Sequence, residues 1–191
     1  MTTFQTEVPD KYLLGDSWGL GWIRYDWHGH RLIGHDGNTI GQAAFLRILP
    51  EAGLAVTLLT NGGNAHDLYE ELYGEIFTAL AGVQIQDPLI PPTVAPDTDL
   101  TPYLGAYERE SVLTEILEID GKPVMRTTLM GPLAELEPEP VTDYPMLPVA
   151  QGLYAVRPDG MEAYAPVTFY TLPTGEEYVH FGARATPRKP A

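Results

Sequence analysis

Short apolar runs alternate with polar residues between positions 18 and 60, and glycine or proline separates one run from the next. The runs are "WGLGWIRYD", "HRLIGHDG", "GQAAFLRILP" and "GLAVTLLT". Alternation with a period of two is typical of β-strands that bury one face. The pair His28-Gly29 and the stretch "PEAG" at residues 50–53 are residue types that turn a chain in a hairpin. The pattern therefore predicts four strands in an antiparallel meander.

A different period follows in "AHDLYEELYGEIFTALAGV", where apolar side chains form two adjacent rows. One row is Leu68, Leu72, Ile76 and Leu80, and the row beside it is Tyr69, Tyr73 and Phe77. This spacing predicts an amphipathic helix with a wide apolar face that covers one side of the sheet. Asn64 is placed to cap its first turn, Asp67 puts negative charge near its N-terminus, and Gly82 can end it.

Residues 84–102 hold five prolines in "QIQDPLIPPTVAPDTDLTP". Proline resists both helix and central strand and favours extended, semi-rigid spacers. This composition predicts a linker at residues 84–102, between a first domain at residues 1–83 and a second at residues 103–191.

The second half again shows short alternating runs, with Asp-Gly, Pro-Asp-Gly and Pro-Thr-Gly turns between several of them. We expect an all-β module of meandering hairpins that closes into a small barrel. Its aromatic side chains either pack the interior or line a cavity, and a barrel of about eight strands is just wide enough to be filled by its own side chains. These aromatic residues are Tyr103, Tyr107, Tyr154, Tyr164, Phe169, Tyr170 and Tyr178.

The charge of the chain narrows the choice of partners. Twenty-six acidic and 11 basic residues give a formal net charge of -15. Such a charge repels phosphate backbones and anionic lipid headgroups, so we expect neither nucleic acid nor membrane as a partner. The absence of cysteine excludes disulfides and a thiol nucleophile. The first residues, "MTTFQTEVPD", do not resemble a signal peptide, and no apolar run is long enough to cross a bilayer. The sequence does not indicate the cellular compartment.

Three of the five histidines lie in "DWHGHRLIGHDG" at residues 26–37, which raises the possibility of a metal site. Asp26, His28 and His30 would form a ligand trio if they shared one strand face. However, Gly29 predicts a turn between the two histidines, which favours a solvated hairpin tip. His35 lies five strand residues beyond His30, roughly 16 Å away at about 3.3 Å per residue, and on the opposite face. We therefore expect no metal and no cofactor here.

The longer segment "GHDGNTIGQAAFLRILPEAGLAVTLLTN" resembles the C-terminal part of the serine β-lactamase and penicillin-binding-protein-like hydrolases, a family that includes class C β-lactamases, esterases and D-amino-acid peptidases. The preceding "WGLGW" and the closing helix belong to the same resemblance, which covers roughly residues 10–83. Beyond the linker, "LTPYLGAYERE" and its turns are similar to the lipocalin-like barrel that follows the hydrolase domain in some members. The expected fold class is therefore α+β: a partial β-lactamase-like antiparallel sheet with a covering helix, then an all-β lipocalin-like barrel.

The resemblance also implies site residues. Many members carry a His-x-Gly triplet in place of the Lys-Thr-Gly triplet of the inner active-site strand, and here it matches His35, Asp36 and Gly37. It implies that His35 lies beside the nucleophile and bonds the substrate or eases proton transfer. It further implies that Gly37 lets the substrate approach and that the N–H of Asn38 serves the oxyanion hole. For Asp36, a structural and a functional role are equally compatible with the resemblance.

The nucleophile of this family is absent from the sequence. The two serines, Ser17 and Ser111, are not followed three residues later by lysine, so there is no Ser-x-x-Lys motif, and no Tyr-x-Asn motif occurs. We expect the C-terminal portion of a serine hydrolase that cleaves an amide or ester of a small molecule or peptide through an acyl-enzyme, inactive as an isolated chain.

Two alternatives remain open from the sequence. One is a non-catalytic ligand-binding or protein-interaction module, and the other is an N-terminal Thr2 nucleophile. The expected partners are the missing N-terminal segment or a dimer partner at an exposed sheet edge.

Overall fold

The computed structural model describes residues 1–39, 41–135 and 138–190, and the chain divides into two compact units. The first comprises Met1–Pro88 with Asp159–Ala163, and the second comprises Leu89–Pro158 with Tyr164–Ala191. The described residues form three antiparallel sheets and one α-helix, as the expected α+β class requires.

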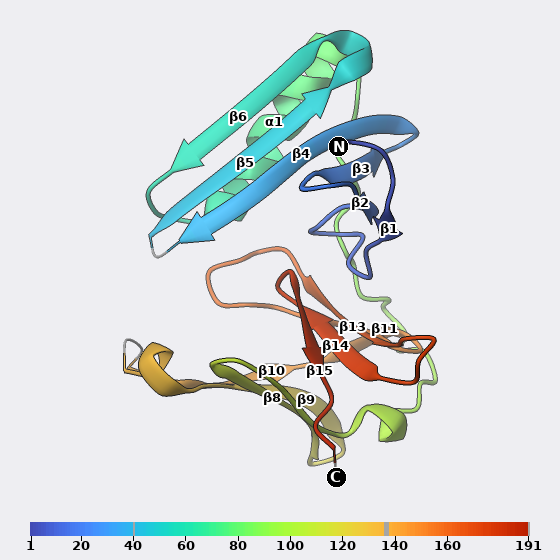
Figure 1. Ribbon diagram of the computed structural model, residues 1–191, viewed down its shortest axis with the longest axis vertical. Coiled ribbons are helices and arrows are strands. Elements are labelled where there is room, and N and C mark those ends of the chain that lie inside the picture. Colours follow the sequence, from blue (N-terminus) through green and yellow to red (C-terminus); the bar gives the residue numbers. More distant parts are fainter. Residues whose placement is uncertain (40, 136–137, 191) are drawn as a thin grey trace. The chain divides into compact units, whose positions relative to one another are not determined.

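The first unit contains a six-stranded sheet in which each strand pairs with the next along the chain (Figure 1). Its strands are β1 (Thr6–Glu7), β2 (Ser17–Trp18), β3 (Ile23–Trp27), β4 (His30–Thr39), β5 (Gln42–Leu49) and β6 (Leu54–Thr60). The predicted meander of four strands is confirmed in β3 to β6. The two-residue strands β1 and β2 were not predicted, because they are too short to show alternation.

The turns of this meander lie where the sequence predicts them. Trp27 pairs with His30 across a two-residue turn in which His28 and Gly29 have φ of 52° and 89°. Positive φ at both positions is the turn whose twist matches paired strands. A 3₁₀ turn, η1 (Pro50–Ala52), joins β5 to β6 and ends at Gly53, whose φ is 61°.

Helix α1 (Ala65–Ala81) packs on one face of this sheet (Figure 1). Its buried residues are Tyr69, Tyr73 and Phe77. The Tyr73 hydroxyl lies 2.8 Å from the backbone oxygen of Phe45 and 3.1 Å from that of Val56, so the helix is tied to β5 and β6. These side chains pack with buried residues of the strands, which are Ile23, Tyr25, Trp27, Leu32, Phe45 and Leu49.

The helix differs from its prediction in two respects. The aromatic row is buried, whereas Leu68 is 46% and Leu80 is 70% exposed. Leu72, between them in the other row, is half-buried and packs against the core. Asn64 occupies the N-cap position, but its side chain makes no capping hydrogen bond. Gly82 ends the helix in the left-handed conformation with φ of 68°, as predicted.

Residues 82–100 carry no helix or strand, and a 3₁₀ turn, η2 (Thr101–Tyr103), precedes the second set of strands. One sheet there has the order β10-β9-β8-β7, and the other has the order β11-β12-β13-β14-β15. The first contains β7 (Gly105–Arg109), β8 (Val112–Ile119), β9 (Lys122–Leu129) and β10 (Val141–Pro145), with η3 (Gly131–Leu133) before β10. The second contains β11 (Leu147–Ala150), β12 (Leu153–Val156), β13 (Ala165–Thr171), β14 (Glu177–Phe181) and β15 (Arg184–Pro187).

These strands do not form the expected closed lipocalin-like barrel. The two sheets meet where the chain continues from β10 to β11 through Met146, and at a single bridge between Tyr107 and Arg188. Pro187 precedes Arg188 and has no backbone N–H to donate toward β7, whereas the N–H of Lys189 donates to the oxygen of Ala106 at 2.8 Å. In the described residues the two sheets share this bridge and no longer ladder.

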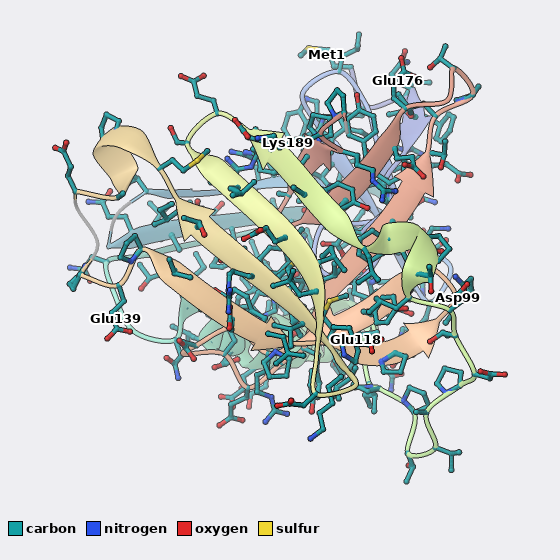
Figure 2. The ribbon with its side chains drawn as sticks, turned by 90° about the horizontal axis from the view of Figure 1, so that it is seen from below. Met1, Asp99, Glu118, Glu139, Glu176 and Lys189 are labelled. Atoms are coloured by element: carbon teal, nitrogen blue, oxygen red, sulfur yellow. The ribbon has the colours of Figure 1, made fainter. Side chains whose placement is uncertain are left out.

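Aromatic side chains fill much of the space between these sheets. Tyr107, Tyr154 and Phe169 are buried, and the rings of Tyr103 and Phe169 stack with centroids 4.4 Å apart. A small cavity of about 160 Å³ remains, lined by residues such as Thr114. Four exposed carboxylates of this unit are labelled in Figure 2; these are Asp99, Glu118, Glu139 and Glu176.

Candidate active site

The strand β4 divides the His-x-Gly segment between two faces of the sheet. Successive side chains of a strand point to opposite faces. His35 and Gly37 are exposed on the face away from α1, whereas Asp36 points toward the helix-covered core. The strand therefore presents His35 and Gly37 together and withdraws Asp36 from them.

The orientation of His35 is set by two neighbours. Its ring meets that of Trp18 edge to face, with centroids 5.7 Å apart. Its Nδ1 lies 2.6 Å from the backbone oxygen of Asp36. A carbonyl oxygen only accepts hydrogen bonds, so Nδ1 carries the proton in this contact, and in the neutral ring Nε2 is then a proton acceptor.

Gly37 and Gly34 are both on β4, but the fold requires only one of them to be glycine. A Cβ added to Gly34 would lie 1.9 Å from the backbone oxygen of Leu46, so a side chain there would clash with β5. A Cβ added to Gly37 would meet no atom within 4 Å, and the φ of Gly37 is not positive. Neither packing nor backbone conformation in the described residues explains the glycine at position 37.

A hollow of about 540 Å³ adjoins this end of β4. All of its lining residues are uncharged; they are Gly37, Asn38, Thr39, Gln42, Ala43, Ala44, Leu59, Thr60 and Asn61. Asn38 pairs with Ala43 of β5 at its rim. Two of the three predicted site residues, Gly37 and Asn38, thus share the hollow, whereas His35 lies two residues before it on the same strand.

Asp36 has a structural role on the core side of the sheet. Its carboxylate accepts two hydrogen bonds from Arg47 of β5, at 2.5 and 2.8 Å, although only 1% of Arg47 is exposed. The guanidinium is stacked on the ring of Tyr25, 3.8 Å from its centroid, and lies 4.8 Å from that of Tyr69. Burial raises the pKa of the Tyr25 hydroxyl, which stays protonated and lies 3.4 Å from Asp36.

Sequence reasoning missed Arg47. The only signal for it is an arginine at a buried position of the alternating run "FLRIL", where a cation is costly unless an anion accompanies it.

The three residues weighed as metal ligands are engaged separately. His28 Nε2 lies 3.1 Å from the backbone oxygen of Ile85, and His30 contacts the carboxylate of Glu51. Asp26 accepts a hydrogen bond of 2.7 Å from the N–H of Gly29 and so stabilises the turn.

One other group has spacing suited to a metal ion within the described residues. The potential ligand atoms of His66, Asp67 and Glu70, on the first turns of α1, lie within 4.8 Å of one another. Burial lowers the pKa of His66, which favours the neutral imidazole that binds metals. However, the helix N-terminus at which they lie disfavours cations.

In the described residues, no hydrogen bond joins the side chain of either serine to a lysine or a histidine. Ser17 is buried on β2, where its hydroxyl lies 3.1 Å from the carboxylate of Asp16 and accepts a hydrogen bond of 3.2 Å from Arg24. Ser111 lies between β7 and β8 with a φ of 65°.

No helix in the described part of the chain combines the length and hydropathy that a membrane span needs.

The sequence of the first unit is similar to known proteins. Residues 2–81 match the Beta-lactamase family. A stretch of 97 residues is 41% identical to penicillin-binding protein 4 of Amycolatopsis lactamdurans, and this match covers 51% of the chain and 26% of that protein. The chain thus spans about a quarter of the length of this curated relative.

Solved structures extend the likeness to both units. The crystal structure of SurE with D-Leu matches 97% of this chain and 42% of its own, with a TM-score of 0.68 and 25% identity. A second crystal structure of SurE matches 97% of this chain and 41% of its own, with a TM-score of 0.64 and 26% identity. The elements of both units therefore have counterparts within a longer protein.

Proposed function

We propose that this chain forms one wall of the active site of a serine hydrolase that cleaves amides or esters through an acyl-enzyme, while a segment outside the chain supplies the nucleophile. The observation that carries the proposal is Gly37, whose missing side chain leaves open space on an exposed strand face and serves no need of the fold. A glycine at a position where only an approaching molecule would need the space suits a substrate-binding strand.

Further support comes from the relatives. The match of residues 2–81 to the Beta-lactamase family makes a serine-hydrolase origin reasonable, and the much greater length of penicillin-binding protein 4 and SurE accounts for the absence of Ser-x-x-Lys. The bound D-Leu of one SurE structure suggests an amino-acid or peptide substrate.

In this proposal, His35 assists proton transfer. Its Nδ1 bond to the oxygen of Asp36 leaves Nε2 as the acceptor in the neutral ring, so Nε2 is the atom through which His35 would exchange a proton. Gly37 admits the substrate backbone, and the N–H of Asn38 is one of two oxyanion donors. Loss of one such donor costs about 2.7 to 4 kcal/mol in other acyl-transfer enzymes.

The test is a chimera in which this chain is joined to the part of penicillin-binding protein 4 that lies outside the match. We expect it to react with a fluorophosphonate probe, which labels activated serines, and to hydrolyse ester substrates, whereas the isolated chain does neither. His35→Ala should lower its turnover by roughly two orders of magnitude. His30→Ala on the same strand is the matched control. Labelling of the isolated chain at Ser17 or Ser111, or equal turnover in His35→Ala, would contradict the proposal.

A further inference from the structure

The small cavity of the second unit lies between its two sheets, near the turns that join β7 to β8 and β14 to β15. It has a volume of about 160 Å³, and its apolar lining comes from both sheets; these residues are Val112, Leu129, Val179 and Phe181. An apolar cavity of about 150 Å³ in another protein takes up benzene. The space therefore suits a molecule built on a single six-membered ring.

Thr114 and Thr186 bring hydroxyl groups to this cavity from opposite sheets. Both residues line the cavity, and they are only 5% and 4% exposed. No hydrogen bond joins either hydroxyl to another residue in the part of the chain that the structure describes. A buried hydroxyl without a partner costs free energy, and a polar group inside the cavity would remove this cost. The two threonines therefore indicate an occupant with a polar group in its buried part.

Two arginines lie at the rim of the cavity, and neither forms an ion pair with a carboxylate of the described residues. Arg109 lines the cavity at the end of β7, and Arg184 begins β15 opposite Phe181. Arg109 donates to the backbone oxygen of Glu110 at 3.4 Å, and Arg184 donates to that of Ala183 at 3.0 Å. Burial, and then the nearby charge of Arg184, lower the pKa of the Arg109 guanidinium.

This pair of cations is unexpected in so acidic a chain. The sequence holds 26 acidic and 11 basic residues, yet Arg109 and Arg184 lie close enough to repel one another. An anion bound at both guanidinium groups would replace this repulsion by charge-assisted hydrogen bonds. The planar fork of a guanidinium matches the two oxygens of a carboxylate. The rim therefore favours a ligand with a carboxylate.

The strands arrange these groups in order from the rim inward. On β15, exposed Arg184 is followed two residues later, on the same face, by buried Thr186. On the facing sheet, Arg109 ends β7 and Thr114 lies within β8. An occupant thus meets cations at the rim and hydroxyls in the buried interior, with apolar side chains around its body.

We propose that this cavity binds a small carboxylate whose apolar ring carries a hydroxyl at the opposite end, with the carboxylate at the two arginines and the hydroxyl at the two threonines. The proposal does not rest on the proposed function, because all the residues that carry it belong to the second unit and the candidate active site belongs to the first.

The first test compares four small molecules that differ in one group at a time. Binding of 4-hydroxybenzoate to the whole chain is measured by isothermal titration calorimetry, beside benzoate, the neutral 4-(hydroxymethyl)phenol, and acetate, which has no ring. We expect 4-hydroxybenzoate to bind roughly tenfold or more tightly than each of the others, and its affinity to fall with added salt. No binding of 4-hydroxybenzoate, or equal affinity for the neutral alcohol, would overturn the inference.

Variants of the rim test the role of the arginines. Arg109→Gln/Arg184→Gln should weaken the binding of 4-hydroxybenzoate roughly tenfold or more. Arg157→Gln makes the same change at an exposed arginine of the same unit and should bind like wild type. Circular dichroism checks that the variants are folded. Equal affinity in the double variant and the control would contradict the assignment of the carboxylate.

Variants of the interior test the role of the hydroxyls separately. Thr114→Val and Thr186→Val keep the shape of the side chain and remove its hydroxyl. We expect each to weaken 4-hydroxybenzoate and to leave benzoate unchanged, because benzoate has no hydroxyl for the threonines to bond. In nuclear magnetic resonance spectra of the wild-type chain, 4-hydroxybenzoate should shift the amide signals of both threonines. Equal weakening of the two ligands, or signals that stay in place, would overturn the proposed orientation.

Discussion

Asp36 and Arg47 form a bidentate ion pair on the helix-covered side of the sheet, directly behind the exposed His35. The two N–O distances are 2.5 and 2.8 Å, and 1% of Arg47 is exposed. Because Asp36 is the middle residue of the His-x-Gly triplet, it anchors to β5 the strand that presents His35 and Gly37 on the other face.

Loss of one partner of this pair should be costly. Asp36→Asn leaves the Arg47 guanidinium in the core without its counter-charge, and we expect the free energy of unfolding to fall by about 3 to 5 kcal/mol. All three tryptophans lie in the first unit, so denaturant unfolding followed by tryptophan fluorescence reports on this unit. The control is Arg31→Ala, whose more exposed pair with Asp16 should contribute at most about 1 kcal/mol.

Replacing both partners of the pair by apolar residues tests whether the unpaired charge of Arg47 explains the loss of stability. Asp36→Leu/Arg47→Met removes both charges together, and we expect it to cost less than Asp36→Asn alone. A double variant at least as unstable as the single one would show that packing rather than charge explains the loss.

The glycines of β4 should respond to alanine in opposite ways. Gly34→Ala places a Cβ against the backbone oxygen of Leu46 and should destabilise the first unit by about 1 to 3 kcal/mol. Gly37→Ala meets no atom and should leave stability within about 1 kcal/mol of wild type, because alanine suits a strand at least as well as glycine. In the chimera, Gly37→Ala should still lower turnover at least roughly tenfold, because the methyl group occupies the space of the substrate. Full activity of this variant would remove the main support for the substrate-binding role of β4.

Stability of the first unit should depend on pH through Asp10. Only 1% of this residue is exposed, and burial raises the pKa of its carboxyl from 3.8 to about 6, against the lowering effect of hydrogen bonds from the backbone N–H groups of Leu13 and Tyr12. At a pH between these two pKa values, the Asp10 carboxyl is protonated in the folded state and ionised in the unfolded state. Stability therefore falls as pH rises from about 4 to 6, by about 3 kcal/mol in all.

The variant Asp10→Asn isolates this contribution, because its side chain keeps an oxygen for the same N–H groups and does not titrate. We expect the stability difference between variant and wild type to grow in favour of the variant from pH 4 to pH 7, in urea unfolding at each pH. A constant difference would show that Asp10 does not titrate in this range.

The two rows of α1 should differ in their effect on folding. Tyr73→Phe removes the hydroxyl that bonds the backbone of β5 and β6, which should cost about 1 kcal/mol. Leu80→Ser changes a side chain that is 70% exposed and should alter stability by less than about 0.5 kcal/mol. A larger loss in Leu80→Ser would mean that Leu80 itself contributes to the core of this unit.

The local elements were predictable because their causes are local. Alternation predicted β3 to β6, His28-Gly29 and Gly53 predicted the turns, and Gly82 predicted the end of α1. The exposed and buried sides of β4 follow from the period of two, which separates His35 and Gly37 from Asp36. The use of these residues in a site came only from a family resemblance, because spacing alone does not distinguish a substrate strand from any other.

What the sequence determined by itself is the set of strands, turns and the amphipathic helix, since backbone propensity and side-chain period act over a few residues. The tertiary structure decided which apolar row of α1 is buried, because both rows have helical spacing and only contact with the sheet distinguishes them. It also decided that Arg47 pairs with Asp36, an ion pair between residues 11 apart that depends on strand register. Barrel closure, finally, depends on hydrogen bonds between β7 and the end of the chain, where Pro187 lacks the N–H that a ladder needs.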